Sequence, residues 1–535
     1  MNPDSLRRRF GKAVVRAPTA AQAAGYDRIS IDERGVPEAA LMENAGRQAA
    51  LIIDRLFPKG RVVALVGSGN NGGDALVCLR ALAAWGRRVS AVLVGNRPET
   101  DPVLHGWDLS ASVFDPEHPG AEDQLGQRLE GAAVLVDGLL GTGIRGAPRA
   151  RQAGAIGVVN RANGAVVALD TPSGVDGTSG DVPGSAIRAD VTIAFGWPKL
   201  GTLLHPGREH CGRIVAVEIG FPPGDGKGWA ELITPGWASD VLPSRAAVTH
   251  KNAVGAVAIV AGSAMPGAAL LAARSAFRCG AGLVRVCASF RAREIVAEVP
   301  EAIFVDARDR DAVCAAIEQS DAVALGPGIG TDEEAVAQVE AALAARADRP
   351  AVIDADALTL LARGAGGGPG AVGGSRVAGR GGVVVTPHPG EMARLVGAST
   401  TEVQGDRVGT AKRFAAAHGL VALLKGAPSL VAYPGGGLLV STHETPSALA
   451  VAGMGDVLTG AIGAYLAQGV DPVAAAGLAL HVTGAAASLD GGGTSLMPSD
   501  VVEAIPAALS ALSHPDRADT DLPFPFVTFD QRQPA

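Results

Sequence analysis

Short apolar runs rich in valine, alanine and leucine recur along the chain and alternate with amphipathic segments. The run Arg61–Val66 (RVVALV) leads through glycine-rich Gly67–Asp74 into apolar residues at helical spacing over Ala75–Trp85. A second run, Val89–Val94, follows. Runs that are apolar at every position are typical of strands buried on both faces of a parallel sheet. The pattern predicts an α/β fold with a strand–helix–strand unit. Further strands are predicted at Ala132–Val136, Ala165–Leu169, Val191–Phe195 and Arg213–Ile219, after two helices within Ala20–Ile53.

The same pattern restarts in the second half of the chain. Phe221–Ala246 is rich in proline and glycine and carries little periodicity, so we interpret it as a linker. We therefore predict domains over residues 1–228 and 229–515, followed by a flexible tail of residues 516–535. The strands predicted in the second domain are Ala256–Ala261, Val284–Ala288, Ala322–Leu325, Ala351–Ile353, Val383–Thr386 and Val421–Leu424, with a helix over Leu270–Cys279.

Three strands of the first half end in acidic or glycine-rich loops. These loops are Gly67–Asp74, Asp137–Gly146 and Asp170–Asp176. A single Asp after a strand is often only a helix cap. Because the carboxyl ends of parallel strands share one edge of the sheet, three such ends predict a ligand site there.

The segment Ala450–Gly460 carries the clearest chemistry in the second half. Gly453 and Gly455 let the backbone approach a ligand closely, and the apolar residues that follow predict a helix. The amino end of a helix attracts anions, and Asp456 lies there as a potential base. Such an arrangement suits phosphoryl transfer to a hydroxyl, although a glycine-rich turn capped by Asp456 would have the same pattern.

Composition narrows the classes of partner. The chain has 46 basic and 54 acidic residues, a net charge of −8 and no long basic run, which argues against nucleic acid. Its five cysteines are scattered without a C-x-x-C pair, so we expect neither zinc nor disulfides, and a cytoplasmic location. The uncharged stretch Ala253–Ala273 could span a membrane by length, but Gly255 and Pro266 favour strand, loop and helix. We expect no membrane partner.

Nine short motifs follow one another along nearly the whole chain: GSGNNGGD, DGLLGTG, DTPSGVDG, GAALLAARSAFRCGAGLV, GPGIG, DADAL, TPHPGE, LKGAPS and GMGDVLTG. In this order they resemble the family of bifunctional NAD(P)H-hydrate repair enzymes. The resemblance implies a Rossmann-like three-layer αβα epimerase domain followed by a ribokinase-like αβα dehydratase domain. In that family the first domain interconverts the R and S epimers of hydrated NADH or NADPH (NADHX or NADPHX). The second uses ADP to phosphorylate the hydroxyl of the S form, and loss of phosphate restores NAD(P)H and leaves AMP.

The resemblance also implies roles for particular residues. In the dehydratase, Asp456 would take the proton of the hydroxyl. The residues that would bind the hydrated nucleotide are Ala268, Gly328, His388 and Asp456, and those that would bind ADP or AMP are Lys425, Gly426, Ala427, Pro428, Ser429 and Gly455. Mg²⁺ would accompany the nucleotide, and the family leads us to expect a homo-oligomer.

In the epimerase, Asp170 is the candidate acid/base group and Lys199 a secondary one, although a lysine after a strand is more often a solvated charge. A potassium ion would be held by Asn71, Asp137 and Ser173. The substrate would be bound by Asn70, Asn71, Gly72, Gly73, Asp74, Gly141, Thr142, Gly143, Ile144, Arg145, Gly146, Ala147 and Asp170.

Two alternatives remain open at this point. A ribokinase-like small-molecule kinase with a regulatory first domain would use the same Asp456 motif, but it leaves the three strand ends of the first half without a role. A nucleotide-sensing scaffold would be expected to lose its acidic site residues, whereas Asp74, Asp137 and Asp170 are present. The chain departs from the family at Pro446, where relatives commonly have Asn, and at Ala452, where Gly is frequent.

Overall fold

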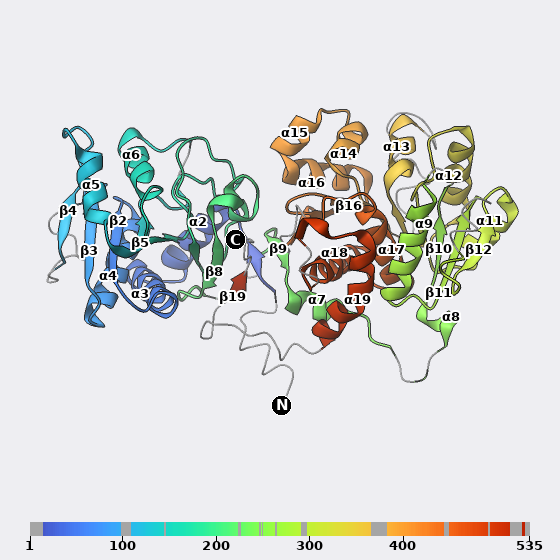
Figure 1. The fold of residues 1–535 in the computed structure, drawn as a ribbon, viewed down its shortest axis with the longest axis horizontal. Helices are drawn as coiled ribbons and strands as arrows, with labels where there is room; N and C mark the ends of the chain where they lie inside the picture. The colour runs from blue at the N-terminus through green and yellow to red at the C-terminus, as the bar shows by residue number, and fades with distance from the viewer. Residues whose placement is uncertain are drawn as a thin grey trace. The chain divides into compact units, whose positions relative to one another are not determined.

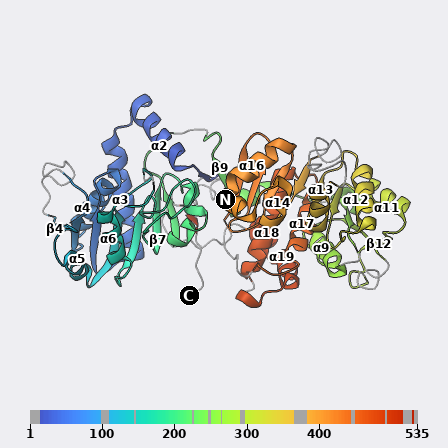
Figure 2. The same ribbon diagram turned by 90° about the horizontal axis from the view of Figure 1, so that it is seen from above.

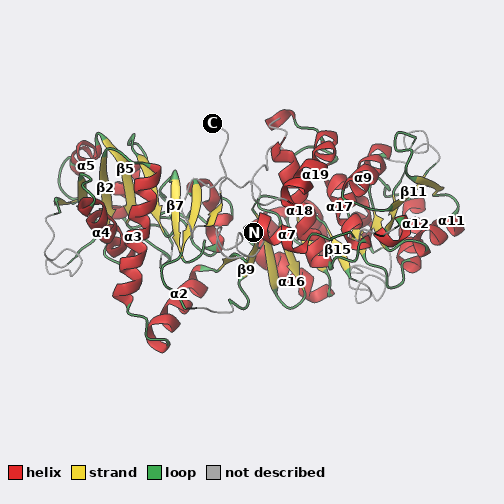
Figure 3. Ribbon diagram, turned by 90° about the horizontal axis from the view of Figure 1, so that it is seen from below, coloured by secondary structure: helices red, strands yellow, loops and turns green. Residues whose placement is uncertain are grey.

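The computed structural model describes residues 14–97, 109–143, 146–222, 226–245, 248, 250–262, 265–289, 297–364, 382–442, 449–489, 493–513 and 527–529. The chain divides into two compact units, unit 1 (Met1–Ala230 with Ala518–Ala535) and unit 2 (Glu231–Arg517). Both are α/β, as predicted, with strands layered between helices (Figure 3).

Unit 1 is built on one sheet with the strand order β19-β8-β7-β6-β5-β2-β3-β4. All neighbours are parallel except β19, which is antiparallel to β8. The strands of this sheet are β2 (Arg61–Val66), β3 (Val89–Leu93), β4 (Ala111–Val113), β5 (Ala132–Gly138), β6 (Ala165–Leu169), β7 (Val191–Phe195), β8 (Arg213–Val217) and β19 (Val527–Phe529), and the short strand β1 (Arg16–Ala17) is not part of it. The helices are α2 (Ala20–Arg28), η2 (Ile29–Glu33), α3 (Glu38–Leu56), α4 (Asn70–Ala84), α5 (Ala121–Leu129), α6 (Ala150–Val159), η3 (Leu200–Leu203) and η4 (Gly207–His210).

Strand β2 shows why these runs are apolar at every position. Successive side chains point to opposite faces of the sheet, so a strand covered on both faces needs apolar residues throughout. Val62, Ala64 and Val66 pack with α3 and α4, whereas Val63 and Leu65 pack with α5 and α6.

Two expectations for unit 1 need correction. Asn70–Asp74 was expected to be loop, but α4 already begins at Asn70, so these residues form its first turn. A glycine-rich stretch can open a helix when its backbone contacts a neighbouring strand end, which the local pattern does not reveal. The tail, expected to be flexible, contributes strand β19 over Val527–Phe529.

Unit 2 has the strand order β9-β18-β17-β16-β15-β14-β13-β10-β11-β12. From β12 to β16 the neighbours are parallel, and β16, β17 and β18 form antiparallel hairpins. The strands are β9 (Ala230–Ile233), β10 (Ala256–Val260), β11 (Leu283–Ala288), β12 (Ile303–Asp306), β13 (Ala322–Leu325), β14 (Ala351–Ile353), β15 (Val383–Val385), β16 (Val421–Leu424), β17 (Leu430–Tyr433) and β18 (Gly437–Ser441). The helices are α7 (Pro235–Val241), α8 (Lys251–Val254), α9 (Pro266–Arg278), α11 (Arg310–Glu318), α12 (Glu333–Ala345), α13 (Ala355–Arg363), α14 (Pro389–Val396), α15 (Thr400–Gly405), α16 (Arg407–His418), α17 (Met454–Ala467), α18 (Pro472–Leu489), η6 (Gly493–Ser495) and α19 (Pro498–Ser513).

Part of the expected linker Phe221–Ala246 is packed structure. It contains β9 and α7, and Thr234 caps α7 by accepting a hydrogen bond from the N–H of Trp237 at 3.1 Å. Trp237 itself lies in the core of unit 2. The Thr-Pro pair at the start of α7 is a recognisable helix-start signal, which the surrounding prolines obscured.

Helix α18 is long and apolar enough to cross a membrane by length and composition, and among the described helices it alone meets that test. In the fold it packs between α17 and α19, which lie beside it in Figures 1 and 2. Most of its residues, including Leu478 and Val482, belong to the core of unit 2. The apolar side chains of α18 therefore pack in the core of unit 2.

Helices α9 and α17 approach closely at Gly460. A Cβ atom there would lie 2.1 Å from the carbonyl oxygen of Ala272, and the Ser275 hydroxyl donates to the carbonyl of Val457 at 2.6 Å. The contact fixes the start of α17, which carries Asp456, against α9.

We expect Gly460→Ala to lower the free energy of unfolding of unit 2 by about 1–3 kcal/mol, since an added methyl group forces two packed backbones apart. Urea unfolding measures the effect. Gly405→Ala is the matched control, because a Cβ at that helix end meets no atom within 4 Å, and it should change stability by less than about 0.5 kcal/mol. A Gly460→Ala protein as stable as the parent would contradict the close packing.

Candidate active sites

The site of unit 1 lies where the strand order reverses. β2 has β3 on one side and β5 on the other, and open α/β sheets bind ligands at such a point. Asn71, in the first turn of α4, is 7% exposed and donates through Nδ2 to the carbonyls of Leu140 at 2.8 Å and Leu169 at 3.2 Å. Its Oδ1 is buried and has no hydrogen-bond donor among the described residues. This oxygen is a free acceptor inside the site.

Asp137, at the end of β5, is held by the loop that follows β6. It accepts from the Ser173 hydroxyl at 2.6 Å, from the Ser173 N–H at 2.8 Å and from the Leu139 N–H at 3.2 Å. Burial raises the pKa of Asp137 to about 6, and the hydrogen bonds from Ser173 and Leu139 limit the rise. The three residues predicted to hold potassium thus come from three neighbouring strand ends.

Any cation in unit 1 would be held largely by neutral oxygen atoms. Among the described residues, no group of three or more His, Cys, Asp or Glu side chains is arranged to hold a metal ion. Asp137 supplies one carboxylate, Ser173 a hydroxyl and Asn71 its unpaired amide oxygen. Oxygen ligands with little charge suit a large monovalent cation better than a transition metal.

Asp170 follows β6 in a left-handed backbone conformation, with φ of 65°. Its Oδ1 accepts from the Lys199 ammonium group and, at 3.2 Å, from the N–H of Phe195. Lys199, the secondary candidate, is only 3% exposed and donates to the Phe195 carbonyl at 3.0 Å, so it is not the solvated charge that was its alternative. Burial, together with nearby Asp170 and Asp27, raises the pKa of Asp74 well above its usual value. Asp27, on α2, is a neighbour that the sequence did not single out.

The other predicted epimerase residues surround this centre. Asn70 is exposed and donates to Glu38 Oε1 at 2.8 Å, and Gly141 lies against Asn71, where a Cβ would be 3.4 Å from the Asn71 Cβ. Arg97, missed from the sequence, donates to the carbonyls of Gly67 at 2.8 Å and Gly69 at 3.1 Å. Gly72 and Gly73 open α4, Thr142, Gly143, Gly146 and Ala147 are described as loop, and Ile144 and Arg145 lie outside the described residues.

The site of unit 2 gathers around the first turn of α17. Gly453 is the N-cap in a left-handed conformation, with φ of 98°, and a Cβ there would meet Leu271 at 2.8 Å. Asp456 is 8% exposed and lies in the first turn. The N–H of Met454 donates to the Val451 carbonyl at 3.3 Å and that of Asp456 to the Gly453 carbonyl at 3.1 Å, so of the first-turn N–H groups only that of Gly455 has no backbone acceptor among the described residues. Burial and the nearby Asp354 raise the pKa of Asp456 to about 7, and Lys425 opposes the rise.

Lys425, directly after β16, forms an ion pair in which its own side chain is 21% exposed and that of Asp354 is 2% exposed. Its ammonium is 2.7 Å from Asp354 Oδ1 and 4.0 Å from Glu391 Oε2. Burial alone would lower the pKa of Lys425, but Asp354 and Glu391 raise it above its usual value. Asp354 lies after β14, and its Oδ2 accepts from the Thr459 hydroxyl of α17 at 2.9 Å. The sequence marked Asp354 only as a strand end.

Hydrogen bonds within the predicted nucleotide loop, Lys425–Ser429, and from Arg407 fix the conformation of that loop. The Ser429 hydroxyl accepts from the Gly426 N–H at 3.2 Å, and the Ala427–Pro428 peptide bond is cis. Arg407 donates to the carbonyls of Lys425 at 3.2 Å and Pro428 at 2.9 Å. Burial lowers the pKa of Arg407 to about 10, which leaves it charged at neutral pH.

His388 is the N-cap of α14. Its Nδ1 accepts from the Gly390 N–H at 3.0 Å, while Glu391 accepts from the His388 N–H at 2.8 Å. Burial and nearby Lys425 lower the pKa of His388, so the ring is neutral at pH 7 and carries its proton on Nε2. The role of His388 as N-cap and a role as a ligand donor are therefore compatible.

The two remaining predicted contacts lie at the reversal point of the second sheet, between β10 and β13. The Ala268 N–H donates to the Met265 carbonyl at 3.0 Å. Gly328 has φ of 57°, and a Cβ there would lie 2.5 Å from that carbonyl. Both residues thus adjoin Met265. Ala452 is exposed, and Pro446 lies outside the described residues.

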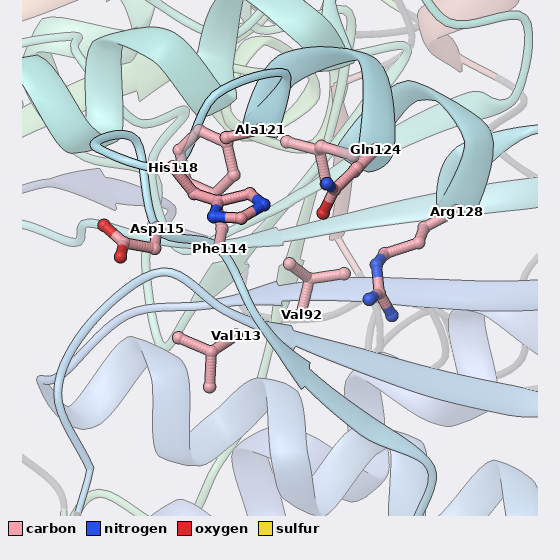
Figure 4. Close-up of a pocket in the computed structure, with 9 residues that line it drawn as sticks. Val92, Val113, Phe114, Asp115, His118, Ala121, Gln124 and Arg128 are labelled. Carbon is pink, nitrogen blue, oxygen red and sulfur yellow. The ribbon is translucent and has the colours of Figure 1, made fainter.

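Two surface pockets in the described part of the chain lie away from these centres. One of about 260 Å³, at β4 and α5, is lined by Phe114, His118 and Arg128 among others (Figure 4). The other, of about 540 Å³, lies among α14, α15 and α16 and is lined by Val403 and Phe414 among others. The predicted site residues lie at the strand ends and not in these pockets.

Comparison with known proteins covers nearly the whole chain. Residues 38–201 match the family model for the YjeF-related protein N-terminus, and residues 257–506 match that for NAD(P)H-hydrate dehydratase. The bifunctional NAD(P)H-hydrate repair enzyme of Moorella thermoacetica is 35% identical, over 92% of this chain and 96% of that protein. The enzyme of the same name from Thermofilum pendens is 34% identical, over 91% and 94%.

Among solved structures, an ADP/ATP-dependent NAD(P)H-hydrate dehydratase from Bacillus subtilis, co-crystallised with ATP and Mg²⁺, is similar to unit 2. It is 30% identical, and the match covers 52% of this chain and 98% of that chain with a TM-score of 0.46.

Proposed function

Because the chain belongs to the family of bifunctional NAD(P)H-hydrate repair enzymes, we propose that its two strand-end sites carry the two steps of that repair. Unit 1 epimerises hydrated NADH and NADPH, and unit 2 dehydrates the S epimer at the expense of a nucleotide. The observation that carries the assignment for unit 2 is a buried carboxylate, Asp456, in the first turn of a helix and beside the ammonium of Lys425.

The first step in unit 2 is transfer of the terminal phosphoryl group of ADP to the hydroxyl of the hydrated ring, with AMP as the leaving group. Asp456 accepts the hydroxyl proton, and a base with a pKa of about 7 is substantially ionised at neutral pH. Lys425 and the amino end of α17, where the Gly455 N–H has no backbone acceptor among the described residues, neutralise the transferring phosphoryl group. The C–O bond to phosphate then breaks, and loss of a ring proton restores the dihydropyridine.

The nucleotide is held by the Lys425–Ser429 loop, whose carbonyls Arg407 fixes. Magnesium would be held through the phosphate oxygens of the nucleotide and would neutralise part of their charge. Ala268, Gly328 and His388 contact the hydrated nucleotide, with His388 donating from Nε2. We also propose that the phosphoryl donor is ADP and not ATP.

In unit 1, Asp170 is the acid/base group of epimerisation, oriented by its ion pair with Lys199. The glycine-rich first turn of α4, together with residues 141–147, binds the phosphates and the ring of the substrate. Its amino end favours negative charge, as expected for a dinucleotide ligand.

A potassium ion completes the site of unit 1 in this proposal. The unpaired Oδ1 of Asn71, the carboxylate of Asp137 and the hydroxyl of Ser173 would hold it, and it would supply positive charge near the substrate's phosphates.

We expect epimerisation to be faster in KCl than in LiCl of equal ionic strength. In Asn71→Leu, which removes the amide oxygen, that ratio should fall to about one. Asp181→Ala, at an exposed carboxylate bonded to the Ser179 hydroxyl, is the control and should keep the ratio. An undiminished potassium effect in Asn71→Leu would refute this cation site.

Absorbance at 340 nm tests the whole function. A mixture of R and S epimers of hydrated NADH, with ADP, K⁺ and Mg²⁺, should be restored completely and faster than spontaneous epimerisation allows. Recovery that stops at the S fraction would remove the epimerase from the proposal. No recovery with either ADP or ATP would instead favour a small-molecule kinase. We further propose that the chain works in the cytoplasm, without nucleic-acid or membrane partners, as a homo-oligomer.

A further inference from the structure

Asp354 is a buried carboxylate of unit 2 that the sequence did not assign to the site. It is 1% exposed, and each of its oxygens has one strong partner. Oδ1 lies 2.7 Å from the ammonium of Lys425, and Oδ2 lies 2.9 Å from the hydroxyl of Thr459. The three residues come from the end of β14, the end of β16 and the second turn of α17. One buried carboxylate thus ties together three segments that are far apart in the sequence.

This ion pair lies directly against the first turn of α17. A Cβ atom at Gly455 would be 3.2 Å from Asp354 Oδ2 and 3.4 Å from Lys425 Nζ. The glycine therefore lets the pair approach the helix backbone one residue before Asp456. Without Asp354, the Lys425 ammonium would keep Glu391, at 4.0 Å, as its one carboxylate ion-pair partner among the described residues.

We propose that Asp354 is the positioning residue of phosphoryl transfer, which holds the ammonium of Lys425 against the first turn of α17 where the transferring group is bound. The inference rests on the proposed function of unit 2. An ammonium fixed in place stabilises a developing charge better than one that must reorient, so the gain is expected in the transition state more than in nucleotide binding.

The charges around Asp456 make this role measurable. Asp354, Asp356 and Lys425 face it, and Lys425 in turn faces Glu391 and His388. Asp354 raises the pKa of Asp456 and Lys425 lowers it. Removing the negative charge of Asp354 should therefore lower that pKa, and the acid limb of the pH–rate profile should move to lower pH. Removing the positive charge of Lys425 should move it to higher pH.

The test compares Asp354→Asn with Thr459→Val in the full-length enzyme. For Asp354→Asn we expect kcat for dehydration of the S epimer to fall about 10–100-fold and the dissociation constant of ADP, measured by calorimetry, to change less than about threefold. The acid limb of kcat/KM should move down by about one pH unit. Thr459→Val keeps the charge and the ion pair, and it should leave the acid limb in place.

An unmoved acid limb in folded Asp354→Asn, or an equal shift in Thr459→Val, would overturn the proposal. If Asp354→Asn does not fold, Lys425→Gln serves instead, because its acid limb must move in the opposite direction, to higher pH. Asp456→Asn distinguishes a failure of the proposed function of unit 2 from a failure of the role proposed for Asp354. If it retains turnover, the base assignment fails, and if it is inactive while the limb in Asp354→Asn stays put, only the role of Asp354 fails.

Discussion

Asp456→Asn should lower the rate of dehydration of the S epimer by about 10²–10⁴-fold while leaving the affinity for ADP within about threefold of the parent. The change keeps the size of the side chain and the first turn of α17, and it removes the group that accepts the hydroxyl proton. Single-turnover restoration of absorbance at 340 nm gives the rate, and calorimetry gives the ADP affinity.

The pH dependence of the parent enzyme supplies a second check on the same residue. Since the pKa of Asp456 is about 7, the fraction of ionised base falls as the pH drops below 7, and kcat/KM should fall with it. In Asp456→Asn that acid limb should disappear. Asp356→Asn removes a neighbouring charge without touching the base and should retain turnover. Full activity in Asp456→Asn would show that another group takes the proton.

Asp170→Ala should abolish epimerisation and leave dehydration of the pure S epimer unchanged. It removes the candidate acid/base group and leaves the ammonium of Lys199 buried without that partner, which costs about 3–5 kcal/mol in comparable pairs. Asp170→Asn is therefore needed beside it, because it keeps a hydrogen-bond acceptor for Lys199. Epimerisation is followed by chromatographic separation of the R and S forms.

Asp181→Ala is the matched control for unit 1. Asp181 is an exposed carboxylate bonded to the Ser179 hydroxyl at 2.8 Å, and its removal should affect neither reaction. Loss of both activities in a folded Asp170→Asn protein would contradict the assignment of the two reactions to separate sites.

The strands could be predicted because a strand buried on both faces is apolar at every position, and that pattern is visible within the strand's own residues. Arg61–Val66, Ala165–Leu169 and Val191–Phe195 have the predicted bounds. Helix starts were less accurate: α4 begins at Asn70 and α9 at Pro266, each several residues before the predicted start. The first turn of α4 contains two glycines, and α9 begins with proline followed by glycine. These residues are also typical of loops, so the sequence pattern does not separate a loop from the start of a helix.

Contacts between distant segments could not be predicted from one sequence. Asp354 and Lys425 are 71 positions apart, and nothing near either residue indicates that they pair. The burial of Lys199 beside Asp170 depends likewise on the order of β6 and β7 in the sheet. The unpaired oxygen of Asn71 is defined only once two carbonyls have taken its amide hydrogens.

Each unit buries its own sheet in its own core, and this has a consequence for how damage to the gene would be felt. A mutation that unfolds only unit 1 would leave dehydration of the S epimer intact. Repair of the R epimer would then be limited by the rate at which it converts spontaneously to the S form. A mutation that unfolds only unit 2 would leave an enzyme that interconverts the R and S epimers but dehydrates neither of them. The first defect delays the recycling of the cofactor, whereas the second stops it.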